Sequence, residues 1–363
     1  MTIECHSRVP IPYIPAKAGI PPFVIPAKAG IEYNKRNTKN GKAQRMATKK
    51  RVAISIGDMN GIGPHLALLA HNRVKTLVDP VYCVDDAMMA QAAKLLRLSV
   101  PKDFTTVSPQ AQPFTVTPGS IDASSGAYAF ASFQCAVDLA KEGKADAVCT
   151  LPVHKKAWEL AGVPYKGHTD ALRDFFQKEA IMMLGCEAMY VALFTEHIPL
   201  KDVPSHIEQS KLTRFLVDFY RTARPQRTVA VLGLNPHAGD GGVLGNEEEV
   251  IAASIRQAVQ TIRTTLAASY PLPSPLFTEP LVPDVAFTPH MRTRYTHYVA
   301  MYHDQGLAPL KALYFEESIN VSLNLPILRT SVDHGTAFDI AYQGKKVSTR
   351  SYLQAIGYIV KHG

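Results

Sequence analysis

The stretch Val52-Ala-Ile-Ser-Ile-Gly-Asp-Met-Asn-Gly-Ile-Gly-Pro64 decides the fold class of this 363-residue chain. Residues 52–56 form a short apolar run of the kind found in buried strands, and the glycine-containing segment 57–64 follows directly. We expect a strand, a tight turn and then a helix that runs to about Ala70. This arrangement is typical of the opening unit of an α/β domain.

The same alternation of apolar runs and amphipathic stretches continues to the end of the chain. It predicts strands at 147–151, 189–194, 228–232 and 297–302, and helices at 128–141, 169–177, 247–265 and about 350–361. Strands alternating with helices favour a mostly parallel sheet. In open α/β sheets ligands bind beyond the carboxyl ends of the strands, so we expect the functional residues in those loops.

The composition indicates a globular protein with a full core, because 46% of the residues are hydrophobic and 19% are charged. No apolar run approaches the roughly 18 to 20 residues of a membrane-spanning helix, so no membrane partner is expected. The net charge of +8 is confined to the N-terminal part: residues 1–51 hold eleven Lys or Arg and two Glu. The remaining chain is close to neutral, which argues against a nucleic-acid partner.

Residues 1–50 are expected to form a disordered extension. The sequence Ile-Pro-Ala-Lys-Ala-Gly-Ile occurs twice there, at 14–20 and 25–31, and two copies are too few for a stacked repeat fold. Met46 directly precedes the first strand and is a candidate for the natural start, with an organelle transit peptide as the alternative interpretation. The five cysteines, Cys5, Cys83, Cys135, Cys149 and Cys186, form no CxxC pair, which favours reduced thiols in a cytoplasmic protein.

Three histidines directly follow predicted strands: His197, His237 and His303. Neutral imidazoles bind Zn²⁺, Co²⁺ and similar ions, and catalytic ions commonly have three protein ligands and one open position. The shared position of these histidines at strand ends indicates a catalytic metal. Ordinary hydrogen-bonded loop histidines remain the alternative, because the spacing matches no short metal-binding signature.

Two further segments predict a site for an anionic substrate. His168 and Thr169 open a predicted helix, and helix N-termini attract anions. Lys311, Asn320 and Arg329 lie in or near an apolar, strand-like region, where a cation is costly to bury without an anionic partner. A phosphorylated or carboxylated substrate would supply that partner, although simple surface exposure would also explain these residues.

Two glycine-containing segments are candidates for cofactor binding. The turn at 57–64 could let backbone amides approach a phosphate, or it could be only a tight connection between strand and helix. The polar loop at 331–344 is expected to lead into a short helix and to hold an adenosine ribose through Asp or His.

Together these segments resemble the 4-hydroxythreonine-4-phosphate dehydrogenase family of vitamin B6 synthesis. The resemblance rests on motifs that follow one another in order from residue 51 to residue 363. They are Gly57-Asp58 with Gly61-Ile-Gly-Pro64, Leu151-Pro-Val-His-Lys155, Gly167-His-Thr169, His197-Ile-Pro-Leu200, Leu234-Asn-Pro-His-Ala-Gly239, Met301-Tyr-His-Asp-Gln-Gly-Leu307 and Leu328-Arg-Thr-Ser-Val-Asp-His-Gly-Thr336.

The resemblance implies an isopropylmalate/isocitrate-dehydrogenase-like α/β fold with two mostly parallel subdomains and a cleft between them. One subdomain would comprise roughly 51–150 and 275–363, and the other roughly 151–274. A homodimer with active sites at the subunit interface is implied, with one metal-binding histidine supplied by the partner subunit. The implied ligands of the divalent ion (Zn, Mg or Co) are His197, His237 and His303. The implied substrate contacts are His168, Thr169, Lys311, Asn320 and Arg329, and the implied dinucleotide-binding loop includes Asp333, His334, Gly335 and Asp339.

Several positions depart from the family's usual sequence. They are Met59-Asn60 in the first turn, Asp170, Glu196 beside the first metal histidine, and Val243-Leu244. Glu196 would add charge next to a ligand and could change the metal preference.

The expected function is the oxidation of 4-phosphohydroxy-L-threonine by NAD, with NADP as a possibility, followed by loss of CO₂ to give 3-amino-2-oxopropyl phosphate. The metal would lower the pKa of the substrate hydroxyl, and Asp304 and Lys311 are the candidates for the general base. The main alternative is a paralogous metal- and NAD-dependent dehydrogenase of another phosphorylated or carboxylated hydroxy acid. A metal-dependent hydrolase that uses the same three histidines, or a non-catalytic binding module, would also be compatible with these residues.

Overall fold

The computed structural model describes residues 49–266 and 271–363, and residues from Thr48 to Gly363 form one compact unit. The predicted extension at 1–50, with its repeat, Cys5 and Met46, lies outside the described residues except for Lys49 and Lys50. Within the described ranges no helix combines the length and the hydropathy needed to cross a bilayer.

In the described residues, ten strands form a single sheet in the order β3-β2-β1-β4-β10-β9-β5-β6-β8-β7. Six of its nine strand pairings are parallel, which confirms the predicted α/β class with a mostly parallel sheet. The strands are β1 (Arg51–Ser55), β2 (Asp79–Cys83), β3 (Thr106–Val107), β4 (Ala147–Thr150), β5 (Ile181–Cys186), β6 (Met189–Leu193), β7 (Ala230–Val231), β8 (His297–Ala300), β9 (Ile319–Leu323) and β10 (Leu328–Val332).

The strand direction reverses near the middle of the sheet. Strand β9 is antiparallel to both β10 and β5, and β6 is antiparallel to β5, whereas β8 and β7 run parallel to β6. The carboxyl ends of β6 and β8 therefore lie at the opposite edge of the sheet from those of β4 and β10. The loops that contain the candidate residues His197 and His303 therefore leave the sheet at the edge opposite to the loop that follows β10.

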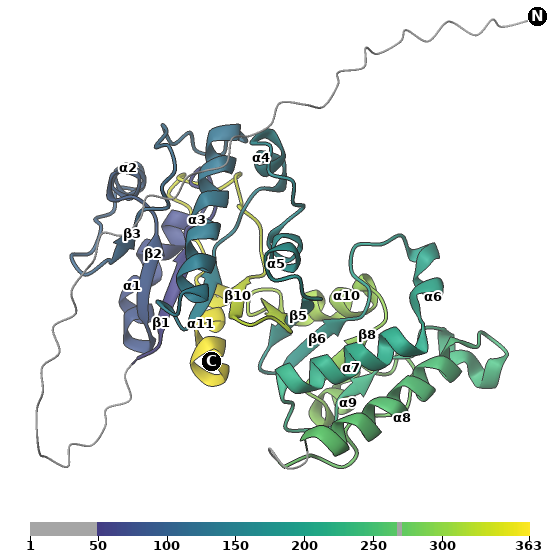
Figure 1. The fold of residues 1–363 in the computed structure, drawn as a ribbon. Helices are drawn as coiled ribbons and strands as arrows, with labels where there is room; N and C mark the ends of the chain where they lie inside the picture. The colour runs from purple at the N-terminus through teal and green to yellow at the C-terminus, as the bar shows by residue number, and fades with distance from the viewer. Residues whose placement is uncertain (1–48, 267–270) are drawn as a thin grey trace, which may run out of the picture. The chain divides into compact units, whose positions relative to one another are not determined.

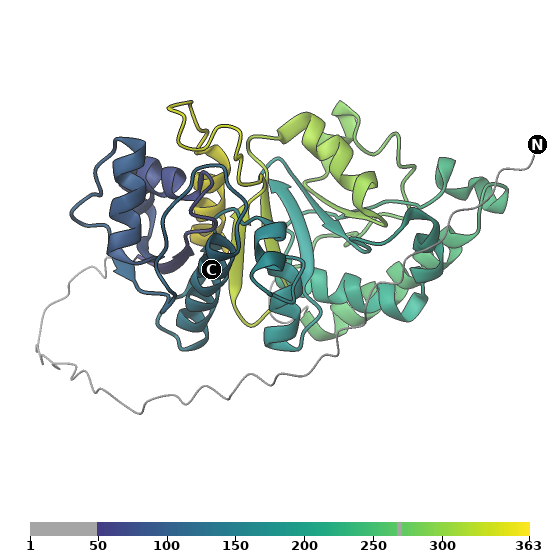
Figure 2. The same ribbon diagram turned by 90° about the horizontal axis from the view of Figure 1, so that it is seen from above.

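Helices cover both faces of the sheet (Figures 1 and 2). The largest core cluster joins one sheet face to α1, α2, α7, α8 and α11, while smaller clusters join the other face to α3, α4, α5 and α10. The helices are α1 (Gly63–Leu77), α2 (Asp86–Leu96), α3 (Ala123–Lys141), α4 (Lys155–Leu160), α5 (His168–Phe176), α6 (Val203–His206), α7 (Gln209–Ala223), α8 (Glu247–Leu266), α9 (Pro289–Arg294), α10 (His303–Tyr314) and α11 (Arg350–His362), with short 3₁₀ segments η1 (Leu200–Asp202) and η2 (Pro236–Gly242).

Two local predictions are corrected by the structure. The region 320–329 is not one strand but the hairpin β9–β10, whose turn begins at Asn324 with a φ of 61°. The loop after β10 does not lead into a short helix: residues 338–344 form turns, and Ala337 and Tyr342 have φ values of 46° and 60°. Such left-handed conformations interrupt a right-handed helix.

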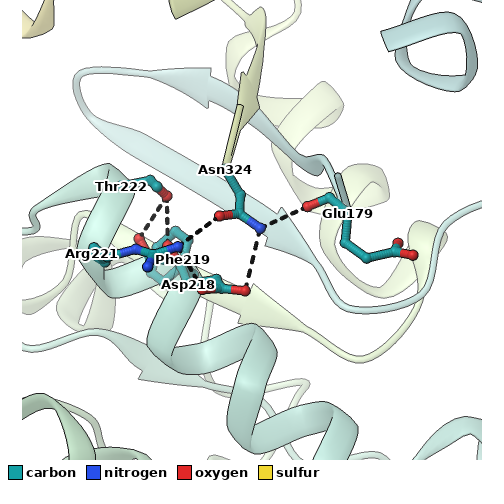
Figure 3. A network of polar contacts seen from close by, with 6 residues as sticks. All are labelled: Glu179, Asp218, Phe219, Arg221, Thr222 and Asn324. Carbon is teal, nitrogen blue, oxygen red and sulfur yellow. Dashed lines mark hydrogen bonds and ion pairs between the residues drawn. The ribbon is translucent and has the colours of Figure 1, made fainter. Parts of the chain in front are cut away.

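The hairpin turn is fastened to its surroundings by Asn324 (Figure 3). Its side-chain amide donates hydrogen bonds to the carbonyl oxygen of Glu179 (2.9 Å) and to Oδ2 of Asp218 (3.3 Å). Its carbonyl oxygen accepts a hydrogen bond from Nη2 of Arg221 (3.0 Å), and Asp218 and Arg221 also form an ion pair on α7. One side chain thus links the hairpin to α7 and to the segment before β5.

The proposed boundaries of the two subdomains, 51–150 with 275–363 and 151–274, stay a prediction. Strand β8 lies between β6 and β7, so residues 297–300 are part of the same end of the sheet as the strands from 151–274. Figure 1 shows the purple and blue N-terminal elements at one end of the sheet and the green elements α7 to α9 at the other.

Candidate active site

A cleft of about 1770 Å³ lies over the central strands, between α4 and α5 on one side and α10 on the other. Its floor is one face of the sheet, because directly paired residues on neighbouring strands point to the same face. Ser331 pairs with both Thr150 and Asn320, and Asn320 pairs with Leu184. The floor therefore combines polar side chains from β4, β9 and β10 with apolar side chains from β5 and β6.

Arg329 is the buried cation of this floor. Only 1% of its surface is exposed, and no carboxylate in the described part of the chain forms an ion pair with it. Its Nη atoms donate hydrogen bonds to Oγ1 of Thr150 (2.6 Å) and Oγ of Ser322 (3.1 Å), whereas its Nε has no partner among the described residues. Burial lowers the pKa of the guanidinium to about 10. A buried charge that lacks a counter-ion is suited to binding an anion.

His168 and Asn320 offer two more unused polar atoms in the same cleft. The Nε2 of His168 and the Oδ1 of Asn320 are both buried, and neither makes a hydrogen bond within residues 49–266 and 271–363. Burial and the charge of Arg329 lower the pKa of His168 well below its usual range, so its imidazole is neutral. Its ring packs edge-on against Phe133 and Trp158. Thr169 lies beside it, buried in the first turn of α5.

Lys311 also lines the cleft, but it has an anionic partner within the chain. Its ammonium group contacts the carboxylate of Asp333 and donates a hydrogen bond to the backbone oxygen of the same residue (3.0 Å). The Asp333 carboxylate accepts a further hydrogen bond from Oγ of Ser318 (2.5 Å). Lys311 therefore has an anionic partner before any ligand binds, and its assignment as a substrate contact stays a prediction.

His197 and His303 lie close together at the other side of the cleft. Their ring centroids are 5.6 Å apart, although one follows β6 and the other begins α10 after β8. Oδ1 of Asp304 lies 2.6 Å from Nδ1 of His303, which leaves Nε2 of that ring free. A carboxylate hydrogen-bonded to one nitrogen of a metal-binding imidazole orients the ring and raises its basicity. The Asp304 side chain is otherwise well exposed.

His237 does not join this pair within one chain. It is exposed on the loop after β7 and does not line the cleft. In the part of the chain that the structure describes, no three His, Cys, Asp or Glu side chains are grouped closely enough to hold a metal ion. Two neighbouring imidazoles fit a partial site for a divalent ion, and a third ligand has to come from outside these two side chains.

The predicted dinucleotide-binding residues are only partly brought together. Asp333, His334 and Gly335 line the cleft, whereas Asp339 does not. The loop that contains them packs on the glycine turn at 57–64: the amide of Ile62 donates to the Thr336 oxygen (3.0 Å).

The glycines of the turn at 57–64 allow close approach of the chain's own backbone. A Cβ atom on Gly57 would lie 2.3 Å from the Pro152 oxygen, and one on Gly61 would lie 2.8 Å from the Thr336 oxygen. These contacts favour the tight-connection interpretation over the phosphate cradle. The carboxyl group of Asp58 is buried in this turn, and burial raises its pKa to about 6.

Two cleft residues were missed by sequence reasoning. Thr150 ends β4 and holds Arg329, and its place at the end of a predicted strand was the available signal. Arg173 forms an ion pair with Glu196 (2.6 Å), whose side chain is 11% exposed. Because Arg173 balances the charge of Glu196, this departure from the family's usual sequence adds no uncompensated charge beside His197.

The motifs that form the cleft match a known family. The sequence profile described as "Pyridoxal phosphate biosynthetic protein PdxA" matches residues 76–359. A 4-hydroxythreonine-4-phosphate dehydrogenase of Sulfurimonas denitrificans is 55% identical over 309 residues, which is 85% of this chain and 96% of the relative. The chain belongs to the PdxA family.

Solved structures agree with this assignment. A crystal structure of a 4-hydroxythreonine-4-phosphate dehydrogenase from Burkholderia phymatum has a TM-score of 0.69 and 31% identity, covering 86% of this chain and 98% of that one. A terephthalate 1,2-cis-dihydrodiol dehydrogenase from Burkholderia xenovorans has a TM-score of 0.58 and 25% identity, covering 86% and 97%. The PdxA fold is thus shared with a dehydrogenase that is named for a terephthalate dihydrodiol.

Proposed function

We propose that this protein oxidises 4-phosphohydroxy-L-threonine with NAD or NADP in a reaction that needs a divalent ion, and that CO₂ is then lost to give 3-amino-2-oxopropyl phosphate. Membership of the PdxA family supports the substrate. The observation that carries the proposal is the buried guanidinium of Arg329, which faces the cleft and has no carboxylate partner among the described residues. An anionic group of the substrate would complete its environment.

The chain's own residues would orient the substrate. Arg329 would bind an anionic group through its free Nε, and Thr169 would add a hydroxyl donor. The free oxygen of Asn320 accepts hydrogen bonds, so it fits an ammonium or hydroxyl group of the substrate. His168, neutral and buried, can exchange a hydrogen bond at Nε2 without adding charge.

Zn, Mg or Co, held by His197, His303 and His237, would polarise the hydroxyl that is oxidised. NAD or NADP would accept the hydride, and His334, Gly335 and Asp339 are the proposed contacts of the dinucleotide. Both candidate bases have a partner, Lys311 in Asp333 and Asp304 in His303, but Asp304 is bound through Oδ1 and its side chain is much the more exposed of the two. This favours Asp304 as the group that takes the proton of the substrate hydroxyl.

We further propose a homodimer in which the His237 loop of a second copy completes each site. The position of His237 outside the cleft of its own chain supports this arrangement. We also expect the enzyme to act in the cytoplasm; the free thiols at Cys83, Cys135, Cys149 and Cys186 are consistent with a reducing compartment.

The activity is tested with purified protein, 4-phosphohydroxy-L-threonine, each dinucleotide and a panel of divalent ions, with NADH absorbance as the readout. Non-phosphorylated 4-hydroxythreonine is the control substrate. NADH formation that depends on the phosphate and on a metal supports the proposal. Equal turnover of both substrates, or no NADH in the presence of every ion, would overturn it.

Subunit complementation tests the shared site. His197→Ala and His237→Ala should each be inactive, but mixing and refolding the two variants should restore roughly a quarter of the activity, because half of the dimers then contain one intact site. Recovery of no activity would contradict the supply of His237 by a second copy.

A second candidate function is a paralogous dehydrogenase for a carboxylated hydroxy acid or diol. The structural similarity to the terephthalate dihydrodiol dehydrogenase supports this second function. Arg329 could bind a carboxylate as well as a phosphate. Faster NADH formation with carboxylated diols than with the phosphorylated amino acid would identify this function.

A further inference from the structure

The loop that carries His237 has an unusual backbone. Residues 237–241 all have positive φ values, between 45° and 78°, and three of them are not glycine: His237, Ala238 and Asp240. L-residues rarely adopt this left-handed conformation, and a run of five is rarer still. The surrounding structure must hold such a conformation in place. Of residues 237–241 only Gly239 is buried, so packing against the core contributes little to this.

Glu248, in the first turn of α8, holds the start of this loop. Its Oε1 accepts hydrogen bonds from the backbone amides of Leu234 (2.8 Å) and Asn235 (2.7 Å). Its Oε2 accepts a third hydrogen bond from Nδ2 of Asn235 (2.9 Å). Pro236 follows these two residues directly, and its ring fixes φ. The backbone is therefore restrained up to the residue that precedes His237.

Two glycines of this segment pack closely against Glu248 and Asn235. Gly239 approaches Glu248 so closely that a Cβ atom there would lie 2.7 Å from Oε2. Gly245 packs against the Asn235 side chain, where a Cβ atom would lie 2.2 Å from Nδ2. The amide of Leu244 donates a hydrogen bond to the Gly239 oxygen (3.0 Å), which ties the end of the loop to its middle.

We propose that Glu248 is a positioning residue for His237: it fixes the loop before metal binds, so that the imidazole is presented in one orientation. This inference rests on the proposed function, in which His237 is the third metal ligand. A ligand on a restrained loop loses less conformational freedom when it binds than one on a mobile loop. Without Glu248 the loop would have to be ordered by the metal, and the metal affinity would fall.

Co²⁺ binding by the metal-stripped full-length protein tests this inference. Titration calorimetry gives the affinity, and the visible absorption of bound Co²⁺ reports its ligand environment. Glu248→Gln removes the charge and the Oε2 acceptor, and should weaken Co²⁺ binding by about 10- to 100-fold, as is usual for residues that orient a metal ligand. The spectrum of bound Co²⁺ should change as well.

Two variants control for charge and for stability. Glu249→Gln removes the same charge from the neighbouring, exposed position of α8 and should bind Co²⁺ as the wild type does. Ile255→Val weakens the buried face of the same helix without touching the loop, so it should lower the thermal midpoint but not the Co²⁺ affinity. The oligomeric state of each variant is compared by light scattering.

The outcomes separate this inference from the proposed function. If the wild type binds Co²⁺ no more tightly than His197→Ala, the metal-dependent function fails. If the wild type binds Co²⁺ and Glu248→Gln binds it within threefold, Glu248 does not position the ligand. Should Glu248→Gln fail to fold, Asn235→Ala removes the side-chain hydrogen bonds of Nδ2 to Oε2 of Glu248 and to Oε2 of Glu247, and keeps the backbone amides that Glu248 binds. A several-fold loss of affinity in that variant supports the inference, and an unchanged affinity overturns it.

Discussion

Replacing Arg329 with Met should stabilise the ligand-free protein. The guanidinium pKa falls from 12.5 to about 10 because the side chain is fully buried. Each tenfold change in proton affinity is worth 1.36 kcal/mol, so burying the charge costs roughly 3 kcal/mol. The folded state binds this proton less tightly than the unfolded chain, so the cost is fully present at every pH below about 10.

The gain in Arg329→Met is smaller than this cost, because the hydrogen bonds to Thr150 and Ser322 are lost. With about 1 kcal/mol for each of the two bonds, the free energy of unfolding should rise by about 1 kcal/mol. Urea unfolding at pH 7.5, followed by circular dichroism, measures this change. Arg350→Met is the matched control, because that arginine is 65% exposed and should change stability by no more than about 0.5 kcal/mol.

The same assay, repeated with inorganic phosphate, tests the anion site directly. Phosphate should stabilise the wild type, since it binds only the folded state, and should have no effect on Arg329→Met. If Arg329→Met is less stable than the wild type and still responds to phosphate, the guanidinium is neither a costly buried charge nor the anion ligand.

Two further predictions concern stability. Because the pKa of Asp58 is raised in the folded state, the free energy of unfolding should fall by about 2–3 kcal/mol as the pH rises from near 4 to above 6. Asp58→Asn should therefore unfold at a higher urea concentration than the wild type at pH 8 but not at pH 4. Equal urea midpoints of variant and wild type at both pH values would contradict this. Asn324→Gly should lose about 1–2 kcal/mol through its three hydrogen bonds. Asn324→Ala should lose about 1 kcal/mol more, because alanine is strained at a φ of 61°. Chemical denaturation of both variants checks this, and identical losses would show that the backbone conformation does not matter.

Much of the fold could be predicted because short apolar runs and amphipathic stretches depend only on residues that are neighbours in the sequence. Strand β1 and helix α8 lie within one residue of the predicted bounds. The direction reversal at β9 could not be predicted, since it depends on pairing between segments more than a hundred residues apart, such as Asn320 with Leu184. The hairpin turn at Asn324 was missed because an isolated asparagine only weakly signals a left-handed residue.

The candidate site was predicted in part for the same reason. His168, Thr169, Asn320 and Arg329 were identified from their sequence context, and all of them line the cleft. The partner of Lys311 was not foreseen, because Asp333 is distant in sequence and becomes its neighbour only through β10 and α10. The place of His237 after a strand indicates a metal ligand, but the fold of one chain does not bring it close to His197 and His303.

The alternation of side chains between the two faces of the central strands has a practical consequence for redesigning substrate specificity. Met182 and Leu184 point to the cleft side, while Met183 between them belongs to the largest core cluster on the opposite face, and Val321 alternates with Asn320 in the same way. A combinatorial library limited to every second position of β5 and β9 would therefore vary what the enzyme accepts while leaving the main core intact. Only the smaller cluster, which joins Met182 and Leu184 to α10, would have to repack around each new side chain.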